Sequence, residues 1–254
     1  MNYKIALVTG ASSGIGKAIA ESLAKHGVRL ILIARRHDKL ELLKRELQAN
    51  TKCHVIACDV VDKERIFQEI TNLPVEFAKI DVLINCAGLA LGLEAAQETE
   101  WKDWETMLNV NCLALTYITH LLLPNMVERN FGHIINIGST AGTYPYKGAN
   151  VYGATKAFVE QFTLNLKADL LGTAVRLTNI EPAIVGDSDF SLVRFKGDKN
   201  KADEVYKGLK PLSPADISEC AIWVLSQPAH VNINRIEIMP TSQAPSHLAV
   251  HKKR

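Results

Sequence analysis

Short, almost continuous apolar runs alternate along most of this chain with segments whose apolar residues recur every three to four positions. The first pattern is typical of strands buried on both faces of a parallel sheet, and the second is typical of amphipathic helices. Strands are predicted at 4–9, 28–34, 53–58, 80–85, 132–138, 174–180 and 235–239, and helices at 14–26, 37–48, 62–72, 101–129, 150–171 and 213–226. Strands that alternate with helices predict an α/β fold around a parallel sheet.

The predicted helix 101–129 has two features that an ordinary core helix lacks. Pro124 is expected to bend or shorten it, because proline has no N–H for the helical ladder. Asn111 is a polar residue in the helix interior, which needs a structural or functional reason. The apolar surface of this helix and of helix 150–171 exceeds what one face of a sheet can cover.

A glycine-rich turn joins the first predicted strand to the first helix. Gly10, Gly14 and Gly16 follow a G-x-x-x-G-x-G spacing, which differs from both G-x-G-x-x-G and the Walker A loop. Residues without a Cβ let backbone N–H groups approach a pyrophosphate at a helix N-terminus. The turn therefore predicts a dinucleotide site, with Ser12, Ser13 and Ile15 among its contacts; the alternative is a glycine turn without a ligand.

Arg35 and Arg36 follow the second predicted strand, where sites for NAD usually carry an acid that binds the ribose 2′-hydroxyl. Two guanidinium groups can bind a 2′-phosphate through bidentate hydrogen bonds, so the sequence predicts NADP(H) as the cofactor. The alternative is that both arginines are solvated at a helix start. Asp59 and Val60 follow the third strand and could contact the adenine, although Asp59 could equally cap the next helix.

Small residues follow the fourth predicted strand in the order Asn85-Cys86-Ala87-Gly88. Cofactors lie outside the carboxyl ends of the strands in sheets of this kind, so Asn85, Ala87 and Gly88 are candidate contacts.

Tyr152 and Lys156 are four positions apart in predicted helix 150–171, and Ser139 follows the strand 132–138. Positions i and i+4 share a helix face, so the ammonium group is expected beside the phenol. A positive neighbour favours phenolate and lowers a tyrosine pKa from its ordinary value of about 10. Ser139 is expected to donate a hydrogen bond to a substrate oxygen. Taken alone, the Tyr-x-x-x-Lys spacing is common, and it favours a surface helix that happens to contain both residues.

Taken together, the glycine turn, Asn85-x-Ala87-Gly88, Asn111, Ser139 and Tyr152-x-x-x-Lys156 resemble the short-chain dehydrogenase/reductase family over essentially the whole chain. Segments 89–92, 138–142, 150–158, 193–198 and 228–234 are similar to its NADP-dependent 3-hydroxy acid dehydrogenase branch, of the serine and allo-threonine 3-dehydrogenase type. The resemblance implies a single doubly wound Rossmann-type domain, residues 1–254, with a seven-stranded parallel sheet and helices on both faces. It also implies a homo-oligomer, a dimer or tetramer formed through helices 101–129 and 150–171.

The resemblance further assigns roles to individual residues. Tyr152 exchanges the proton of the substrate oxygen, Ser139 hydrogen-bonds that oxygen, and Lys156 lowers the tyrosine pKa and binds the nicotinamide ribose. Asn111 is implied to distort its helix and hold a water that relays protons to Lys156. Segment 181–185, with Pro182 and Val185, meets the nicotinamide. Departures from the family pattern are Cys86, Ala183 and Asp187, of which the first two are expected to alter cofactor affinity rather than abolish function.

Residues 186–211 are polar, charged and weakly periodic, which is typical of a lid or binding loop. Arg194 in this segment could bind a substrate carboxylate through a bidentate pair of hydrogen bonds; the alternative is a solvated arginine. The tail, about 240–254, has little helical or strand pattern, and in related enzymes such tails reach a neighbouring subunit.

Charge and composition narrow the function further. A net charge of +2 and a pI near 8.2 leave no strong field for nucleic acid or membrane. No uninterrupted apolar run approaches the length of about 18–20 residues that spans a bilayer. The five cysteines lack metal-site spacing and are expected to be reduced thiols, so the sequence predicts a cytoplasmic protein without a metal.

The sequence therefore predicts an NADP-dependent oxidoreductase that oxidises small 3-hydroxy acids or reduces the matching semialdehyde or 3-oxo acid. One alternative is a reductase of larger carbonyls, such as 3-oxoacyl thioesters. An alternative of another class is an NADPH-binding sensor without turnover, although such a protein has no use for Asn111, Ser139, Tyr152 and Lys156 together.

Overall fold

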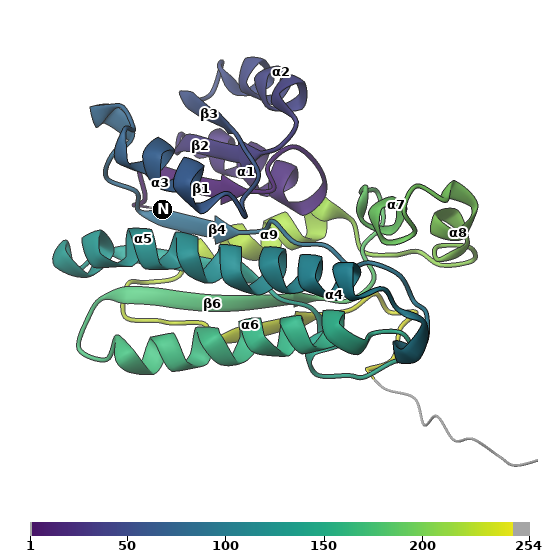
Figure 1. Ribbon diagram of the computed structural model, residues 1–254. Coiled ribbons are helices and arrows are strands. Elements are labelled where there is room, and N and C mark those ends of the chain that lie inside the picture. The colour runs from purple at the N-terminus through teal and green to yellow at the C-terminus, as the bar shows by residue number, and fades with distance from the viewer. Residues whose placement is uncertain (1, 246–254) are drawn as a thin grey trace, which may run out of the picture.

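A parallel seven-stranded sheet forms the centre of the computed structural model, which describes residues 2–245 (Figure 1). The strands lie in the order β3-β2-β1-β4-β5-β6-β7, and every neighbouring pair is parallel. Their bounds are β1 Ile5–Thr9, β2 Arg29–Ala34, β3 Cys53–Ala57, β4 Val82–Asn85, β5 Gly132–Ile137, β6 Val175–Pro182 and β7 Arg235–Ile238. The predicted doubly wound α/β fold is confirmed.

Helices cover both faces of this sheet. The larger ones are α1 Gly14–Lys25, α2 His37–Leu47, α3 Lys63–Thr71, α4 Trp101–Leu108, α5 Leu115–Glu128, α6 Asn150–Asp169 and α9 Pro214–Ser226. Alternate residues of β1 enter different cores: Ala6 and Val8 pack with α1 and α9, whereas Leu7 packs with α5. This two-residue period is what a strand buried on both faces requires.

The predicted helix 101–129 is one continuous run with a π-helical segment, Asn109–Ala114, between α4 and α5. Asn111 lies in that segment, so the expected distortion is present. Its side chain exchanges hydrogen bonds with the backbone of Leu89, donating at 2.8 Å and accepting at 2.9 Å. Pro124 does not shorten the helix, because it lies inside α5, which continues to Glu128.

By length and composition alone, Trp101–Glu128 could cross a membrane, and it is the one such helix among residues 2–245. No continuous apolar run marks this helix in the sequence, because polar residues interrupt its apolar positions. In the fold, Met107, Ile118, Leu122 and Met126 are buried against the sheet and its neighbours. This is the position of a core helix.

Residues 186–211 contain two short helices, α7 Phe190–Arg194 and α8 Lys199–Glu204, which stand at one side of the molecule (Figure 1). The sequence pattern did not predict them, since helices of five and six residues are too short to establish a period. Part of the predicted tail, 246–254, lies outside the described residues.

Candidate active site

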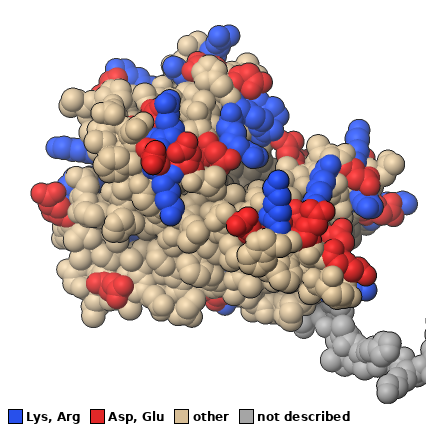
Figure 2. All heavy atoms as spheres, viewed as in Figure 1, with Lys and Arg blue, Asp and Glu red and all other residues tan. Residues whose placement is uncertain are grey.

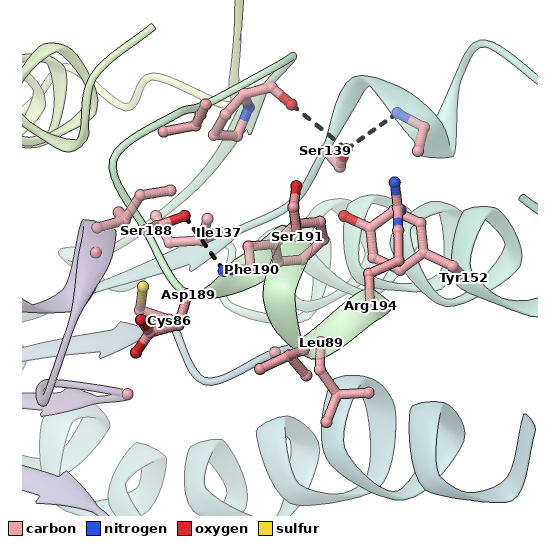
Figure 3. A pocket seen from close by; sticks show the side chains of 18 of the residues that line it. Cys86, Leu89, Ile137, Ser139, Tyr152, Ser188, Asp189, Phe190, Ser191 and Arg194 are labelled. Atoms are coloured by element: carbon pink, nitrogen blue, oxygen red, sulfur yellow. Dashed lines mark hydrogen bonds between the residues drawn. The ribbon is translucent and has the colours of Figure 1, made fainter. Parts of the chain in front are cut away.

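One cavity of about 900 Å³ opens at the carboxyl ends of the central strands. Its walls come from the glycine turn, the ends of β2, β4, β5 and β6, the start of α6, and the segment that carries α7. Figure 3 shows that Ser139, Tyr152 and Arg194 lie at one end, with Asp189 and Cys86 at the other. This position at the end of a parallel sheet is where open α/β folds bind their ligands.

The glycine turn at one end of the cavity is built by close backbone packing. Gly10 and Gly14 have positive φ angles of 68° and 53°. A Cβ on Gly16 would lie 2.5 Å from the carbonyl oxygen of Gly10, so no larger residue fits. Thr9 fixes the turn to β4, because its hydroxyl accepts hydrogen bonds from the backbone N–H groups of Cys86 and Ala87, both at 3.0 Å.

Arg36 is held at the rim of the cavity by the glycine turn and by the segment before α7. Its guanidinium donates to the hydroxyls of Ser12 and Ser13, and to the carboxylate of Asp189 at 2.6 Å. Arg35 is more exposed, and its guanidinium lies 3.9 Å from Asp59. Both arginines line the cavity together with Asp59 and can meet a phosphate there.

The Tyr152 side chain is buried in the cavity wall, and its ring contacts Phe190. Burial raises the pKa of Tyr152 above its ordinary value, while the hydrogen bond of Ser139 and the charge of Arg194 lower it. The net direction differs from the lowering expected from sequence, because burial outweighs the favourable neighbours. The Ser139 hydroxyl also donates to the carbonyl oxygen of Pro182 at 3.4 Å and accepts from the N–H of Ala141.

Lys156 lies one helical turn after Tyr152 and is equally buried. Its ammonium group donates to the carbonyl oxygen of Ile137 at 2.8 Å and lies 6.0 Å from the centre of the Tyr152 ring. Burial lowers the pKa of Lys156 to about 8. The ammonium group is thus directed to a backbone carbonyl oxygen, and the groups that lower the pKa of Tyr152 are Ser139 and Arg194.

Arg194 brings a second cation to the tyrosine. The guanidinium donates to the Tyr146 hydroxyl at 2.9 Å, and its carbon lies 5.2 Å from the Tyr152 ring centre and 5.1 Å from that of Phe190. Its Nε is buried and has no hydrogen-bond partner among the described residues. Arg194 is therefore not the solvated arginine of the alternative interpretation.

The structure brings most of the predicted site residues to this cavity. Those that line it are Gly10, Ser12, Ser13, Gly14, Ile15, Gly16, Arg35, Arg36, Asp59, Val60, Ala87, Gly88, Ser139, Tyr152, Lys156, Pro182, Val185 and Arg194. Asn111 lies behind the wall, where it also donates to the Thr155 hydroxyl at 3.0 Å. Asp59 is not the cap of α3, because Asp62 accepts the capping hydrogen bond from the N–H of Arg65.

Asn85 is an exception, because it does not line the cavity, although its prediction as a cofactor contact stays a prediction. Its side chain is buried below the cavity and donates to Thr119 at 3.0 Å and to Asn136 at 2.8 Å. The alternation of side chains along β4 explains this position. Asn85 is the last residue of the strand, and its side chain points into the sheet packing, whereas Cys86 and Ala87 follow it into the cavity wall.

Among the cavity residues that the sequence did not point to, Tyr146, Phe190 and Asp189 make contacts that matter for the site. Tyr146 lies in an aromatic stretch between Ser139 and Tyr152, which could have drawn attention to it. Phe190 and Asp189 belong to the segment 186–211, whose weak periodicity carried no information about what they contact. Gln243 of the tail also lines this chain's own cavity, where its side chain accepts from the N–H of Ile184 at 3.2 Å.

The departures from the family pattern occur where the backbone makes the contacts. The N–H of Cys86 binds Thr9, and the N–H of Ala183 donates to the carbonyl oxygen of Ile238 at 2.9 Å. Asp187 has a φ of 50°, a conformation that aspartate tolerates better than most residues. These side chains can therefore change without altering the local backbone hydrogen bonds.

The cavity fits a dinucleotide. The glycine turn provides a cradle without Cβ atoms at the N-terminus of α1, and no side chain caps that helix. Gly88 also lines the cavity, where its backbone lies next to the Asn111 and Lys156 side chains.

Comparison with known proteins supports the same family. The family model described as short chain dehydrogenase matches residues 4–196. An NADP-dependent 3-hydroxy acid dehydrogenase of Salmonella typhi is 52% identical over 98% of this chain and 99% of its own length. A sulfoacetaldehyde reductase of Chromohalobacter salexigens is 45% identical over 96% of each chain.

Solved structures agree with this comparison. The closed form of a serine dehydrogenase complexed with NADP⁺ matches with a TM-score of 0.94 and 51% identity, over 98% of this chain and 100% of the other. Matches of this length and identity extend over the glycine turn and the Tyr152 end alike. This chain belongs to the short-chain dehydrogenase/reductase family.

Proposed function

We propose that this protein is an NADP-dependent oxidoreductase that oxidises small 3-hydroxy acids or reduces the matching semialdehyde or 3-oxo acid. The observation that carries the proposal is the position of the Arg194 guanidinium, 5.2 Å from the Tyr152 ring centre inside a cavity that fits a dinucleotide. A cation beside the tyrosine suits a substrate whose carboxylate lies close to its reacting hydroxyl. The 52% identical relative is named for this class of substrate.

NADP(H) is the cofactor in this proposal. The glycine turn with Ser12, Ser13 and Ile15 would hold the pyrophosphate, and Arg35 and Arg36 would hold the 2′-phosphate. Asp59 and Val60 would meet the adenine, and the backbone at Ala87 and Gly88 would border the cofactor. Pro182 and Val185 would face the nicotinamide.

The chemistry of oxidation is divided between the cofactor and four side chains. Bound NADP⁺ supplies the hydride acceptor. Tyr152 takes the proton of the substrate hydroxyl, and Ser139 donates a hydrogen bond to the same oxygen and stabilises its developing charge. Lys156 holds the nicotinamide ribose and favours the phenolate, while Asn111 positions a water that relays protons to Lys156. In the reverse direction Tyr152 returns its proton to the carbonyl oxygen.

Arg194 is the proposed substrate clamp. Its buried Nε has no partner among the described residues, and leaving such a donor unpaired costs about 1–3 kcal/mol. A carboxylate would pair this donor and the adjacent Nη in one bidentate contact. A sulfonate offers similar oxygens, which agrees with a 45% identical relative named sulfoacetaldehyde reductase.

Initial rates of NADP⁺ reduction test the substrate class. L-serine, L-allo-threonine and 3-hydroxypropionate are compared with a secondary alcohol of similar size that has no carboxylate. Activity on the hydroxy acids but not on the alcohol supports the proposal. Activity on the alcohol alone keeps the oxidoreductase and removes the substrate assignment.

Inactivity on all four compounds, with NADPH still bound, would favour the alternatives. A reductase of larger carbonyls would then consume NADPH with 3-oxoacyl thioesters. A sensor would bind NADPH but would not consume it, whichever carbonyl compound is added.

A homo-oligomer, a dimer or tetramer, is also proposed. The face that α5 and α6 present in Figure 2 carries few charged side chains. Leu113, in the π-helical segment before α5, is 49% exposed, and Phe158 on α6 is 43% exposed and stacks on Phe162. Exposed apolar surface of this kind suits an interface between subunits. Leu113→Glu is expected to reduce the molecular mass measured by sedimentation, whereas Phe67→Glu, on the exposed face of α3, is not.

We further propose that the protein is cytoplasmic. All five cysteines are free in the structure, and burial raises the thiol pKa of each. Such thiols suit a reducing compartment.

A further inference from the structure

The short helix α7 has a charged residue at each end, and the two residues reach opposite ends of the cavity. Asp189 is its N-cap residue and contacts Arg36, next to the glycine turn. Arg194 is its last residue and lies over Tyr152. Figure 3 shows the pair on the two sides of Phe190. One rigid turn of helix therefore connects the predicted phosphate site with the predicted substrate site.

The donors of Arg36 are almost fully used within the protein. Nη1 donates to Asp189 at 2.6 Å, Nη2 donates to Ser12 and Ser13 at 3.0 and 2.7 Å, and Nε donates to Ser12 at 3.2 Å. Lys39 adds a second cation, with its Nζ 3.8 Å from the same carboxylate. A guanidinium has five N–H donors, and too few of those of Arg36 are left unpaired to make two hydrogen bonds to a new ligand. A phosphate can therefore form a bidentate contact with Arg36 only if an existing partner leaves.

Asp189 is the partner whose charge resembles that of a phosphate. Its oxygen faces both Arg36 and Lys39, and the hydrogen bond from Arg36 holds the pKa of the carboxyl below its ordinary value. Ser12 and Ser13 are neutral and can turn their hydroxyls to donate to a phosphate instead. A carboxylate cannot do this, and it repels a second anion at the same site.

We propose that Asp189 competes with the cofactor's 2′-phosphate for Arg36 and Lys39, and so sets both the affinity for NADP(H) and its preference over NAD(H). This inference rests on the proposed NADP-dependent function. A 2′-phosphate displaces the carboxylate from the two cations, whereas the neutral 2′-hydroxyl of NAD cannot. Removing the charge of Asp189 therefore strengthens binding of the phosphorylated cofactor and leaves binding of the other unchanged.

Replacement of Asp189 by a phosphate at Arg36 also affects the end of the cavity where Tyr152 lies. The segment before α7 packs closely on the glycine turn, since a Cβ on Gly14 would lie 3.1 Å from the Cβ of Ser188. When Asp189 leaves Arg36, the N-terminal end of α7 loses its ion pair with the residue that binds Ser12 and Ser13 of that turn. Arg194, at the other end of the helix, can then adjust its position over Tyr152.

Calorimetry with cofactor fragments tests the competition without any turnover. Adenosine 2′,5′-bisphosphate carries the 2′-phosphate, and adenosine 5′-diphosphate does not. Asp189→Asn is expected to lower the Kd for the 2′,5′-bisphosphate about two- to fivefold, the range for a partly exposed ion pair. The Kd for the 5′-diphosphate is expected to stay the same. Asp189→Ala, which also loses the hydrogen bond, should give the same direction.

Asp203→Asn is the matched control. Asp203 lies on α8 in the same segment and does not line the cavity, so this variant removes an equal charge without touching Arg36. If Asp203→Asn tightens binding as much as Asp189→Asn, a general change of field explains the result and the competition is refuted. Thermal unfolding of each variant shows that it is folded.

The other outcomes are equally decisive. Weaker binding of the 2′,5′-bisphosphate to both Asp189 variants would show that the carboxylate positions Arg36, which overturns the proposal. Unchanged binding would also overturn it. Adenosine 5′-monophosphate differs from the 2′,5′-bisphosphate only by the 2′-phosphate. If the unaltered protein binds these two equally, the proposed NADP preference fails as well, so the two failures are distinguishable.

Discussion

The guanidinium carbon of Arg194 lies 5.2 Å from the centre of the Tyr152 ring, although the two residues belong to different structural layers. Tyr152 lies in the first turns of α6, and Arg194 ends the short helix α7. The contact gives the cavity a positive charge beside the hydroxyl that the family uses for proton exchange. It also means that any movement of α7 changes the surroundings of the tyrosine.

Arg194→Ala tests the carboxylate clamp. Loss of a charge-assisted hydrogen bond is worth about 1.5–3 kcal/mol, so KM for 3-hydroxy acids should rise about 10- to 100-fold. KM for an uncharged alcohol or aldehyde should change little. Arg194→Lys should recover only part of the affinity, because an ammonium cannot make the two-pronged contact. An equal rise of KM for charged and uncharged substrates would remove the clamp from the mechanism.

Tyr152→Phe separates proton exchange from cofactor binding. General acid–base groups contribute a factor of about 10²–10⁴, so kcat should fall by at least about 100-fold. NADPH binding, followed by fluorescence titration, should persist, because the ring still fills its place against Phe190. Tyr117→Phe, on α5 away from the cavity, should leave both quantities unchanged. Near-normal turnover of the Tyr152 variant would end its assignment as the acid–base group.

Gly16→Ala tests whether the glycine turn is shaped by packing. The added Cβ would lie 2.5 Å from the carbonyl oxygen of Gly10 and 2.8 Å from its carbonyl carbon, both of them backbone atoms. Overpacking of this kind costs about 1–3 kcal/mol, and the displaced turn should also bind NADPH less tightly. Gly27→Ala is the control. Its Cβ would meet nothing within 4 Å, but its φ of 71° is strained for alanine. It should therefore lower stability without altering NADPH affinity.

Glu181 predicts a dependence of stability on pH. It is almost fully buried beside Arg235, and burial together with the charge of Glu160 raises its pKa from 4.5 to about 7. The folded state thus binds this proton more tightly than the unfolded state. The contribution to stability is complete below the unfolded value of 4.5 and is lost as the pH rises through about 7.

Urea unfolding of Glu181→Gln measures this contribution. The amide resembles the protonated acid, so the variant's free energy of unfolding relative to the unaltered protein should increase between about pH 5 and about pH 8. Glu160→Gln should move the loss to lower pH, because it removes one of the two causes of the raised pKa. A difference that does not vary with pH would mean that Glu181 is ionised throughout.

Periodicity predicted the sheet well because its inner strands, β1, β2, β4, β5 and β6, are buried on both faces, which leaves an almost uninterrupted apolar run in each. Local spacing also predicted the glycine turn and the Tyr152–Lys156 pair, since a tight turn and one helical turn are short-range geometries. The prediction was less reliable where it depended on the direction in which a single side chain points. Asn85 lies at the expected strand end, yet its side chain points to Thr119 and Asn136, below the cavity.

The contacts of the α7 segment with the rest of the cavity could not be predicted, because they join residues that are distant in sequence. Asp189 meets Arg36 across 153 positions, and Arg194 meets Tyr146 across 48. The direction of the Tyr152 pKa likewise depends on burial, a property of the assembled fold. The order of residues by itself determined the sheet, the glycine turn and the placement of Tyr152 and Lys156 one helical turn apart, since these follow from local spacing. Only the tertiary structure decided which charges share the cavity, because they come from opposite ends of separate elements.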